Sequence, residues 1–225
     1  MKLLLFFVAA LVAALLAQRM FLSFSAQRVA DYADTGPVFD IRTHLAGPIL
    51  SEGVIYGPDG RVSSRFVADM QGDWTGDSGT LSEHFRFAGG KTQDRRWSLT
   101  MGEGGRFTAT ADDIIGVAQG EQRGAVARIT YRLQLPPPSG GYVLDVVDWL
   151  YLMENGTIMN RSEMRKFGVK VAELVATDCP AAETYGADPQ PRAAQDARHH
   201  EASRARRASG VVTGAEHVGP TQTVA

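Results

Sequence analysis

The sequence of 225 residues contains one cysteine, Cys179. A single thiol excludes an intramolecular disulfide framework and any metal site built from several cysteines. The formal net charge is only −2, from 23 basic and 25 acidic residues, whereas nucleic-acid binding needs a concentrated basic surface. We therefore expect a fold held together by a hydrophobic core, with no nucleic-acid partner and with neither a metal nor another cofactor.

Recognisable catalytic motifs are also absent. The sequence has no His-Glu-x-x-His zinc motif, no phosphate loop, no dinucleotide-binding glycine pattern and no nucleophile elbow. Asp112 and Asp113 are adjacent, but they lack the ordered ladder of ligands that a calcium loop provides. The sequence therefore assigns no catalytic residue, and it favours a protein that is not an enzyme.

The longest apolar run, Leu3 to Ala17, follows Lys2 at the N-terminus. As a helix it would span about 22 Å, at about 1.5 Å per residue. That is shorter than the roughly 30 Å hydrocarbon core of a bilayer and typical of a signal peptide. Alternatively, residues 3–24 stay as one membrane anchor if Arg19 extends its charge to the interface. We predict a signal peptide or membrane anchor plus spacer over residues 1–35. The predicted location is the cell envelope, either anchored in the inner membrane or in the periplasm.

Composition divides the remainder of the chain in two. Residues 179–225 are rich in alanine, arginine, glycine and proline and almost free of aromatic side chains. Such a segment cannot bury enough apolar surface to offset the entropy lost on ordering, so we predict a disordered tail. Residues 36–178 are long enough to enclose one hydrophobic core, and we predict one folded domain there.

Short turn signals divide this domain at regular intervals. In order they are YGPDGR, TGDSGT, AGGKT, GEGGR, GEQRG, PPPSGG and ENGT. Glycine, proline, asparagine and aspartate favour turns, and Asn155–Gly156 in the last signal favours a type I′ hairpin. Frequent turns without a long segment of helical period predict an all-β domain.

Between the turns, apolar and polar residues alternate as in half-buried strands, for example around Leu81 and Phe85. We count about eight or nine strands between residues 51 and 176, preceded by one short helix within residues 39–45. Consecutive hairpins with one apolar face form a meander, and closing the meander removes its exposed edges. The predicted fold is an antiparallel up-and-down barrel of the lipocalin or calycin type, with an N-terminal hydrophobic helix. A two-sheet sandwich is the alternative.

Polar residues interrupt the apolar faces of two of these strands. Glu83 lies between Leu81 and Phe85, and Arg95 precedes Trp97 by two residues on the next strand. A lone buried carboxylate is costly, so Arg95 is the expected partner of Glu83. The pair is interpreted as a structural ion pair or rim contact, as a polar anchor for a ligand in an apolar cavity, or as an acid–base group.

The segment DVVDWLYLM, residues 145–153, is largely apolar on both faces of its strand. We expect both faces to be covered, by residues 39–45, by a membrane or by a partner. Register across the Asn155–Gly156 hairpin predicts that Asp148, Asn160 and Lys166 meet in the interior.

Four stretches of the chain resemble a bacterial envelope family, domain of unknown function 3833. The stretches are GVIYGPDGRVSSRFVADMQGDW, GTLSEHFRFAGGKTQDRRWSL, TATADDIIGVAQGEQRGAVARITYRLQLP and DWLYLMENGTIMNRSEMRKFGVKVAEL. The resemblance covers residues 39–176 and implies a lipocalin-like barrel. Many family members resemble lipoproteins, whereas this chain has Gln18 in place of the acylated cysteine. The residues that match the motif are Glu83, Arg95, Trp97, Asp112, Gly116, Asp148, Trp149, Asn160, Arg161, Met164, Lys166, Phe167 and Gly168. The family has no established activity, so the function stays open.

These patterns favour a membrane-tethered or periplasmic barrel that binds a hydrophobic or amphipathic, lipid-like small molecule. The predicted ligand-binding residues are Glu83, Arg95, Trp97, Asp148, Asn160 and Lys166. One alternative is an enzyme that acts on such a ligand, with Glu83 or Asp148 as the acid–base group. The other is a structural or assembly factor of the envelope that docks through Trp149 and Tyr151.

Overall fold

The computed structural model describes residues 2–21 and 23–181. The α-helices are α1 (Lys2–Phe21) and α2 (Ile41–His44). Single turns of 3-10 helix are η1 (Phe24–Ala26), η2 (Val29–Tyr32), η3 (Glu103–Gly105) and η4 (Pro137–Ser139). The strands are β1 (Gly47–Tyr56), β2 (Val62–Thr75), β3 (Ser78–Phe87), β4 (Thr92–Met101), β5 (Arg106–Thr110), β6 (Ala118–Arg123), β7 (Val126–Gln134), β8 (Val143–Leu152), β9 (Ile158–Lys166) and β10 (Val169–Pro180). The predicted disordered tail, residues 179–225, lies outside the described residues from position 182 onward, whereas Cys179 and Pro180 at its start belong to β10.

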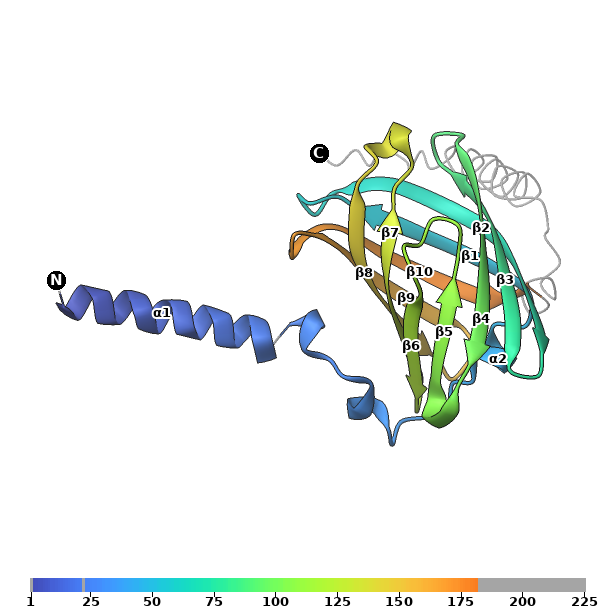
Figure 1. Ribbon diagram of the computed structural model, residues 1–225, viewed down its shortest axis with the longest axis horizontal. Helices are drawn as coiled ribbons and strands as arrows, with labels where there is room; N and C mark the ends of the chain where they lie inside the picture. The colour runs from blue at the N-terminus through green and yellow to red at the C-terminus, as the bar shows by residue number, and fades with distance from the viewer. Residues whose placement is uncertain (1, 22, 182–225) are drawn as a thin grey trace, which may run out of the picture. The chain divides into compact units, whose positions relative to one another are not determined.

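The strands form one closed barrel (Figure 1). Each strand pairs antiparallel with its neighbour in sequence, and β1 closes the barrel by pairing with β10, from Ile49 opposite Pro180 to Tyr56 opposite Glu173. Closure pairs every strand on both sides, which removes the edges that an open sheet would expose. The predicted up-and-down barrel is confirmed, and the sandwich alternative is wrong.

The barrel has ten strands, more than the eight or nine predicted. The additional strand is β6, which includes most of the GEQRG turn signal of residues 120–124. Only Ala118 of β6 is buried, so the strand lacks the alternation that reveals strands in a sequence. A Cβ at Gly120 would lie 2.2 Å from the ring of Phe107. Glycine at this position therefore lets an aromatic ring of β5 fill the space that a β6 side chain would need.

The β8–β9 connection contains the predicted Asn155–Gly156 turn, but its type differs from the prediction. Of the two residues, only Gly156 has a positive φ, +82°, whereas a type I′ turn needs a positive φ at both. The amide of Gly156 donates to the carbonyl of Met153 at 3.0 Å, and the Asn155 side chain accepts from the amide of Thr157 at 3.1 Å. The hairpin is confirmed, and type I′ is wrong because the loop is longer and is capped by the asparagine side chain.

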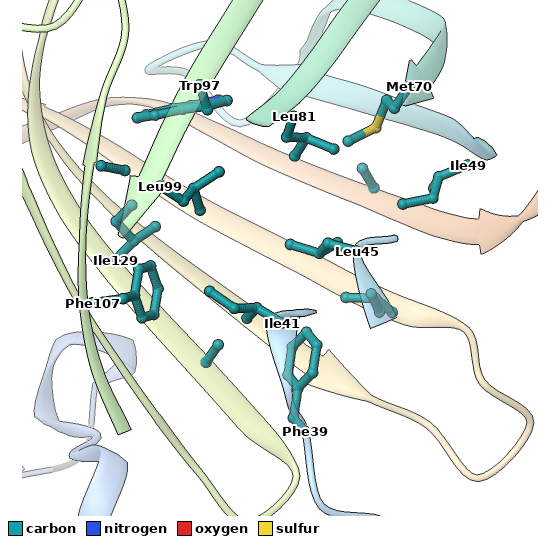
Figure 2. Packing of buried hydrophobic residues seen from close by; sticks show 14 of the residues in the cluster. Phe39, Ile41, Leu45, Ile49, Met70, Leu81, Trp97, Leu99, Phe107 and Ile129 are labelled. Carbon is teal, nitrogen blue, oxygen red and sulfur yellow. The ribbon is translucent and has the colours of Figure 1, made fainter. Parts of the chain in front are cut away.

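The short helix predicted within residues 39–45 is α2, and it closes one end of the barrel. Asp40 caps it by accepting a hydrogen bond from the amide of Arg42 at 3.0 Å. Ile41 and Leu45 then point inward and, with Phe39, pack among the core side chains (Figure 2). The amide of Phe39 donates to the carbonyl of Gly124 at 2.7 Å, which fixes α2 beside the β6–β7 turn. Successive hairpins of a meander alternate between the two ends, so the β7–β8 loop lies at the opposite end.

The outer face of β8 is covered by residues 24–32, which we call the N-terminal strap. Val29 of the strap packs with Trp149 and Val126, and Trp149 is 1% exposed. The amide oxygen of Gln27 accepts hydrogen bonds from the hydroxyls of Tyr32 and Tyr151. The strap, rather than residues 39–45, therefore covers this face, and Trp149 is not available as the docking surface considered above. Residues assigned to the spacer belong structurally to the barrel.

The predicted N-terminal helix is α1, which includes the whole run from Leu3 to Ala17. Within the described part of the chain, no helix has both the length and the apolar character needed to cross a membrane.

Candidate functional site

A cavity of about 240 Å³ lies inside the barrel. Its apolar lining consists of Ile55, Phe66, Met70, Phe85, Phe87, Trp97, Leu133, Leu135, Met164, Leu174 and Ala176. Its polar lining consists of Ser51, Glu83, Gln93, Arg95, Asp113, Tyr131, Gln134, Asp148, Asn160, Ser162 and Asp178. The lining also includes Pro136 and Ser139 of the β7–β8 loop, so the cavity extends toward the end of the barrel opposite α2.

Strand alternation places the polar side chains on the inner face, as it does the apolar ones. Glu83 of β3 is paired in register with Arg95 of β4. Asp148 of β8 is paired with Ser162 of β9. Five of the predicted ligand-binding residues, namely Glu83, Arg95, Trp97, Asp148 and Asn160, line this one cavity.

The expected Glu83–Arg95 ion pair does not form as predicted, because Arg95 binds Asp113 instead. Nη2 and Nε of Arg95 donate to Oδ2 of Asp113 at 2.6 and 3.0 Å. Asp113 belongs to the connection between β5 and β6. This connection places the Asp113 carboxylate within hydrogen-bond distance of the Arg95 side chain on β4. The guanidinium carbon of Arg95 also lies 5.7 Å from the centre of the Trp97 ring, a distance typical of a cation–π contact.

Glu83 therefore holds a buried carboxyl oxygen with no partner. Its Oε2 atom makes no hydrogen bond within the described residues. Burial raises the pKa of Glu83 to about 7. The nearby charge of Arg95 and the side chain of Trp97 oppose the rise, and the carboxyls of Asp178 and Asp148 reinforce it. Glu83 thus gains and loses a proton near neutral pH.

Asp148 is the second buried carboxyl of the cavity, at 8% exposure. The hydroxyl of Tyr131 donates to its Oδ2 at 2.8 Å, while its Oδ1 has no partner among the described residues. Burial raises the pKa of Asp148, and the polar side chains of Ser162 and Tyr131 beside it oppose that rise. The Ser162 hydroxyl donates to Oδ1 of Asn160 at 3.0 Å, so it leaves Oδ1 of Asp148 free. Tyr131 in turn packs edge-on against Trp97, with ring centres 5.3 Å apart, so the polar groups are held by rigid aromatic neighbours.

Asp178 is the third buried carboxyl beside Glu83 and Asp148, and the sequence analysis did not predict it as a site residue. It is 5% exposed on β10 and lies opposite Ser51 of β1. Burial raises its pKa to about 6, while a hydrogen bond from Ser51 opposes the rise. Its two-residue spacing from Ala176 and Leu174 on the inner face of β10 was the available signal. The sequence prediction ended the last strand at residue 176, and it therefore left Asp178 outside the apolar–polar alternation of that strand.

Lys166 does not join Asp148 and Asn160, in contrast to the prediction that the three meet. It is the last residue of β9, and its ammonium nitrogen lies 3.3 Å from the centre of the Tyr142 ring. Lys166 shares the alternation of Asn160, but its position at the strand end puts its charge outside the cavity lining.

One wall of the cavity is aromatic. The ring centres of Phe66 and Phe85 are 5.3 Å apart, edge to face, and those of Phe85 and Phe87 are 6.1 Å apart and stacked. Ile55 and Leu174 also belong to the apolar lining. The cavity therefore presents an apolar wall and a separate set of carboxyl, amide and hydroxyl groups.

A smaller cavity of about 80 Å³ lies on the α2 side of the polar group, where Ile41 and Leu45 form part of its lining. Glu83, Asp148 and Asp178 line both cavities. These three carboxyls consequently lie where the two cavities meet, and we call them the floor of the larger cavity.

The chemistry of this floor suits recognition of hydrogen-bond donors. Within the described residues, no group of three or more histidine, cysteine, aspartate or glutamate side chains is placed to hold one metal ion. Unpartnered carboxyl oxygens accept hydrogen bonds or attract a positive charge, and a carboxyl with a pKa near neutrality can transfer a proton.

The model of the family described as protein of unknown function (DUF3833) matches residues 18–177. The S-type phycobiliprotein lyase CPES from Guillardia theta is similar in structure at 8% identity and a TM-score of 0.46, over 62% of this chain and 90% of that chain. Rv2717c from M. tuberculosis is similar at 16% identity and a TM-score of 0.46, over 65% of this chain and 99% of that chain. No curated protein matches the sequence. The structural likenesses concern the barrel fold alone.

Proposed function

This chain belongs to the DUF3833 family, whose function is unknown, and we propose that its barrel binds a hydrophobic or amphipathic small molecule. The observation that carries the proposal is the cavity of about 240 Å³ with an apolar wall and buried carboxyl oxygens that lack partners. Small-molecule sites combine apolar walls with a few placed polar groups in this way. A buried polar atom without a hydrogen bond lowers the stability of the folded protein. A ligand that donates a hydrogen bond to this atom removes that free-energy cost.

The size of the cavity limits what can bind. About 240 Å³ is slightly below the roughly 300–1,000 Å³ common for small-molecule pockets. A wider groove of about 1,380 Å³ lies at the open end. It shares eight residues with the cavity lining, namely Met70, Glu83, Gln93, Arg95, Asp113, Gln134, Leu135 and Pro136. The proposed ligand therefore places its head and a short apolar portion inside the barrel, and its remainder in this groove.

The location proposed for this activity is the cell envelope. The apolar run of Leu3 to Ala17 after Lys2 supports export of the chain. Fractionation of cells that express the full chain, with N-terminal sequencing of the product, tests this proposal. Recovery of the chain from the cytoplasm with Met1 intact contradicts it.

Uptake of a neutral fluorescent probe tests the binding function. N-phenyl-1-naphthylamine brightens on entering an apolar site, and we expect saturable binding to the full-length chain. Leu174→Trp fills part of the cavity and should weaken binding about tenfold, a change equivalent to about 1.4 kcal/mol. Val169→Trp introduces the same side chain at a position on β10 that is 63% exposed, and it should bind like the wild type. Equal binding by all three proteins would place the probe outside the barrel and overturn the proposal.

A second candidate function is proton-transfer catalysis on such a ligand. It is favoured by one observation, the pKa of about 7 of Glu83 in the cavity floor, because an acid–base catalyst works best when its pKa is near the working pH. Incubation with candidate amphiphiles and mass spectrometry of the products tests it. Glu83→Gln should abolish turnover, whereas loss of the exposed carboxylate in Asp145→Asn should not. Unchanged turnover in Glu83→Gln excludes this role for Glu83.

A further inference from the structure

We infer that the head group recognised by the cavity floor is an organic cation that donates hydrogen bonds, such as a primary ammonium or an amidinium. The inference rests on the proposed function and adds the chemical class of the ligand. It follows from the balance of charge in the lining, from the atoms left without partners and from the position of the floor.

The described cavity lining has an excess of carboxyl groups. Four carboxyls line it, from Glu83, Asp113, Asp148 and Asp178, against one basic side chain, that of Arg95. Arg95 is already bound to Asp113 through two hydrogen bonds. None of the remaining three carboxyls forms a salt bridge among the described residues, although the charge of Arg95 favours the ionised forms of Glu83 and Asp148. Burial makes each ionised form costly.

Two of these three carboxyls also have a free acceptor atom, and so does Asp113, whose Oδ1 is buried without a partner among the described residues while its Oδ2 binds Arg95. Oε2 of Glu83 and Oδ1 of Asp148 are buried and make no hydrogen bond within the described residues. A bound ammonium supplies several N–H donors together with a positive charge, and charge-assisted hydrogen bonds of this kind are about twice as strong as neutral ones. An organic cation thus satisfies both the missing charge and the missing donors.

Other head groups fit less well. A carboxylate or phosphate would face three carboxyls, and the guanidinium of Arg95, the basic group in the described lining, is engaged by Asp113. A neutral alcohol supplies one donor and no charge. A bare metal ion needs several ligands that converge, and the described residues hold no such group of acidic, histidine or cysteine side chains.

The direction of the ligand follows from the arrangement of the lining. Asp148 and Asp178 mark the deep end of the floor, because they also line the smaller cavity next to α2 and do not line the wider groove. Glu83 lines all three spaces and therefore lies on the side of the floor nearer the groove. Phe66, Phe85 and Phe87 form the apolar wall. The cation therefore lies at the deep end, and its apolar portion extends along the phenylalanine rings toward the groove.

Competition among three probes with the same chain and different heads tests the inference. Octylammonium, octanol and octanoate each displace N-phenyl-1-naphthylamine from the full-length chain at pH 8. We expect octylammonium to act at a concentration about tenfold or more below that of octanoate, with octanol between them. This comparison needs no variant, so a folding defect cannot obscure it.

Variants then assign the preference to the floor. In Glu83→Gln and in Asp148→Asn we expect the advantage of octylammonium over octanol to fall about tenfold. Asp145→Asn removes the same charge from the exposed outer face of β8 and should keep the full preference.

The outcomes separate this inference from the proposed function. If the probe binds and the three heads compete equally, or octanoate competes best, the cationic head is excluded while the binding function stands. If the probe does not bind the wild-type chain at all, both are overturned. A preference for octylammonium that persists unchanged in Glu83→Gln and Asp148→Asn overturns the inference by placing the cation elsewhere.

Discussion

Arg95 and Glu83 face each other in register across β4 and β3, yet the guanidinium of Arg95 binds Asp113, at 2.6 Å between Nη2 and Oδ2. The exchange of partners leaves Oε2 of Glu83 buried and without a hydrogen bond in the described residues. A Glu83–Arg95 ion pair would have neutralised the Glu83 carboxylate. In its absence, the carboxyl group keeps a free oxygen atom that can accept a hydrogen bond from a ligand.

Removal of Arg95 should be costly. Arg95→Met leaves Asp113 without its ion-pair partner and Glu83 without its nearest positive charge. Because the side chains of Arg95 and Asp113 are 16% and 25% exposed, the cost should lie below that of breaking a fully buried pair, at about 2 kcal/mol. Urea unfolding at pH 8 measures the change. Arg96→Met, on the exposed face of the same strand, is the matched control and should change stability by less than about 0.5 kcal/mol. A small effect of Arg95→Met would mean that the interior carboxyls are protonated at this pH.

The free energy of unfolding should fall as the pH rises from 4.5 to 7 because of Glu83. Its pKa is raised from 4.5 to about 7 in the folded state. The folded state therefore keeps a proton that the unfolded state releases in this window, and deprotonation favours unfolding. Glu83→Gln has no proton to lose, so at pH 8 it should be more stable than the wild type by about 3 kcal/mol. The difference should vanish below pH 4.5, as followed by urea unfolding across this range. A constant difference at all pH values contradicts the account.

Binding of a cationic probe should strengthen as Glu83 ionises. Glu83 faces Arg95 of β4, Tyr131 of β7, Asp148 of β8 and Asp178 of β10, and its pKa of about 7 places its ionisation between pH 6 and 8. An alkylammonium, with a pKa of about 10 like that of lysine, keeps its charge throughout. Octylammonium affinity should therefore rise about tenfold between pH 6 and 8, while octanol affinity should not rise. Glu83→Gln should remove most of the rise, and an affinity that falls with pH would contradict the role of Glu83.

The close contact between β5 and β6 predicts that Gly120 cannot carry a side chain. Its Cβ would lie 2.2 Å from the ring of Phe107, so Gly120→Ala should destabilise the barrel by about 1–3 kcal/mol through overcrowding. Thermal unfolding of Gly120→Ala and of the Gly120→Ala, Phe107→Leu double variant measures this. We expect the smaller side chain at position 107 to recover part of the loss. Gly89→Ala, where an added Cβ meets nothing within 4 Å, should be near neutral.

The N-terminal strap predicts where a truncated chain stays stable. A chain that begins at residue 23 keeps the strap and should unfold like the full-length protein, whereas a chain that begins at residue 36 exposes Trp149, which is 1% exposed in the intact fold. We expect the shorter chain to lose several kcal/mol, on the order of the cost of exposing a tryptophan and its neighbours. Equal unfolding transitions in urea would show that the strap contributes nothing to the stability of the barrel.

Much of this arrangement could be predicted from the sequence because strand alternation is a local signal. The period of two placed Glu83, Arg95, Trp97, Asp148 and Asn160 on inner faces, and all five line one cavity. Closure of the meander then follows from the need to pair strand edges.

The features that the sequence did not predict lie in loops and at the ends of strands. The alternation of apolar and polar residues gives no information on side-chain positions there. Asp113 reaches Arg95 from the β5–β6 connection, which no period describes. Lys166 shares the alternation of Asn160, but β9 ends at Lys166 and the side chain lies against Tyr142. Residues 24–32 fall within the predicted anchor-plus-spacer segment of residues 1–35, because their contacts, such as that of Gln27 with Tyr151, join positions far apart in sequence.

A crystal structure of the full-length chain with octylammonium tests the central claim most directly. We predict one molecule inside the barrel, with its nitrogen within hydrogen-bond distance, about 2.7–3.2 Å, of Oε2 of Glu83 and Oδ1 of Asp148. Its alkyl chain should lie along Phe66 and Phe85. Octylammonium bound only outside the barrel, or bound inside with its nitrogen directed toward the open end, would contradict the account.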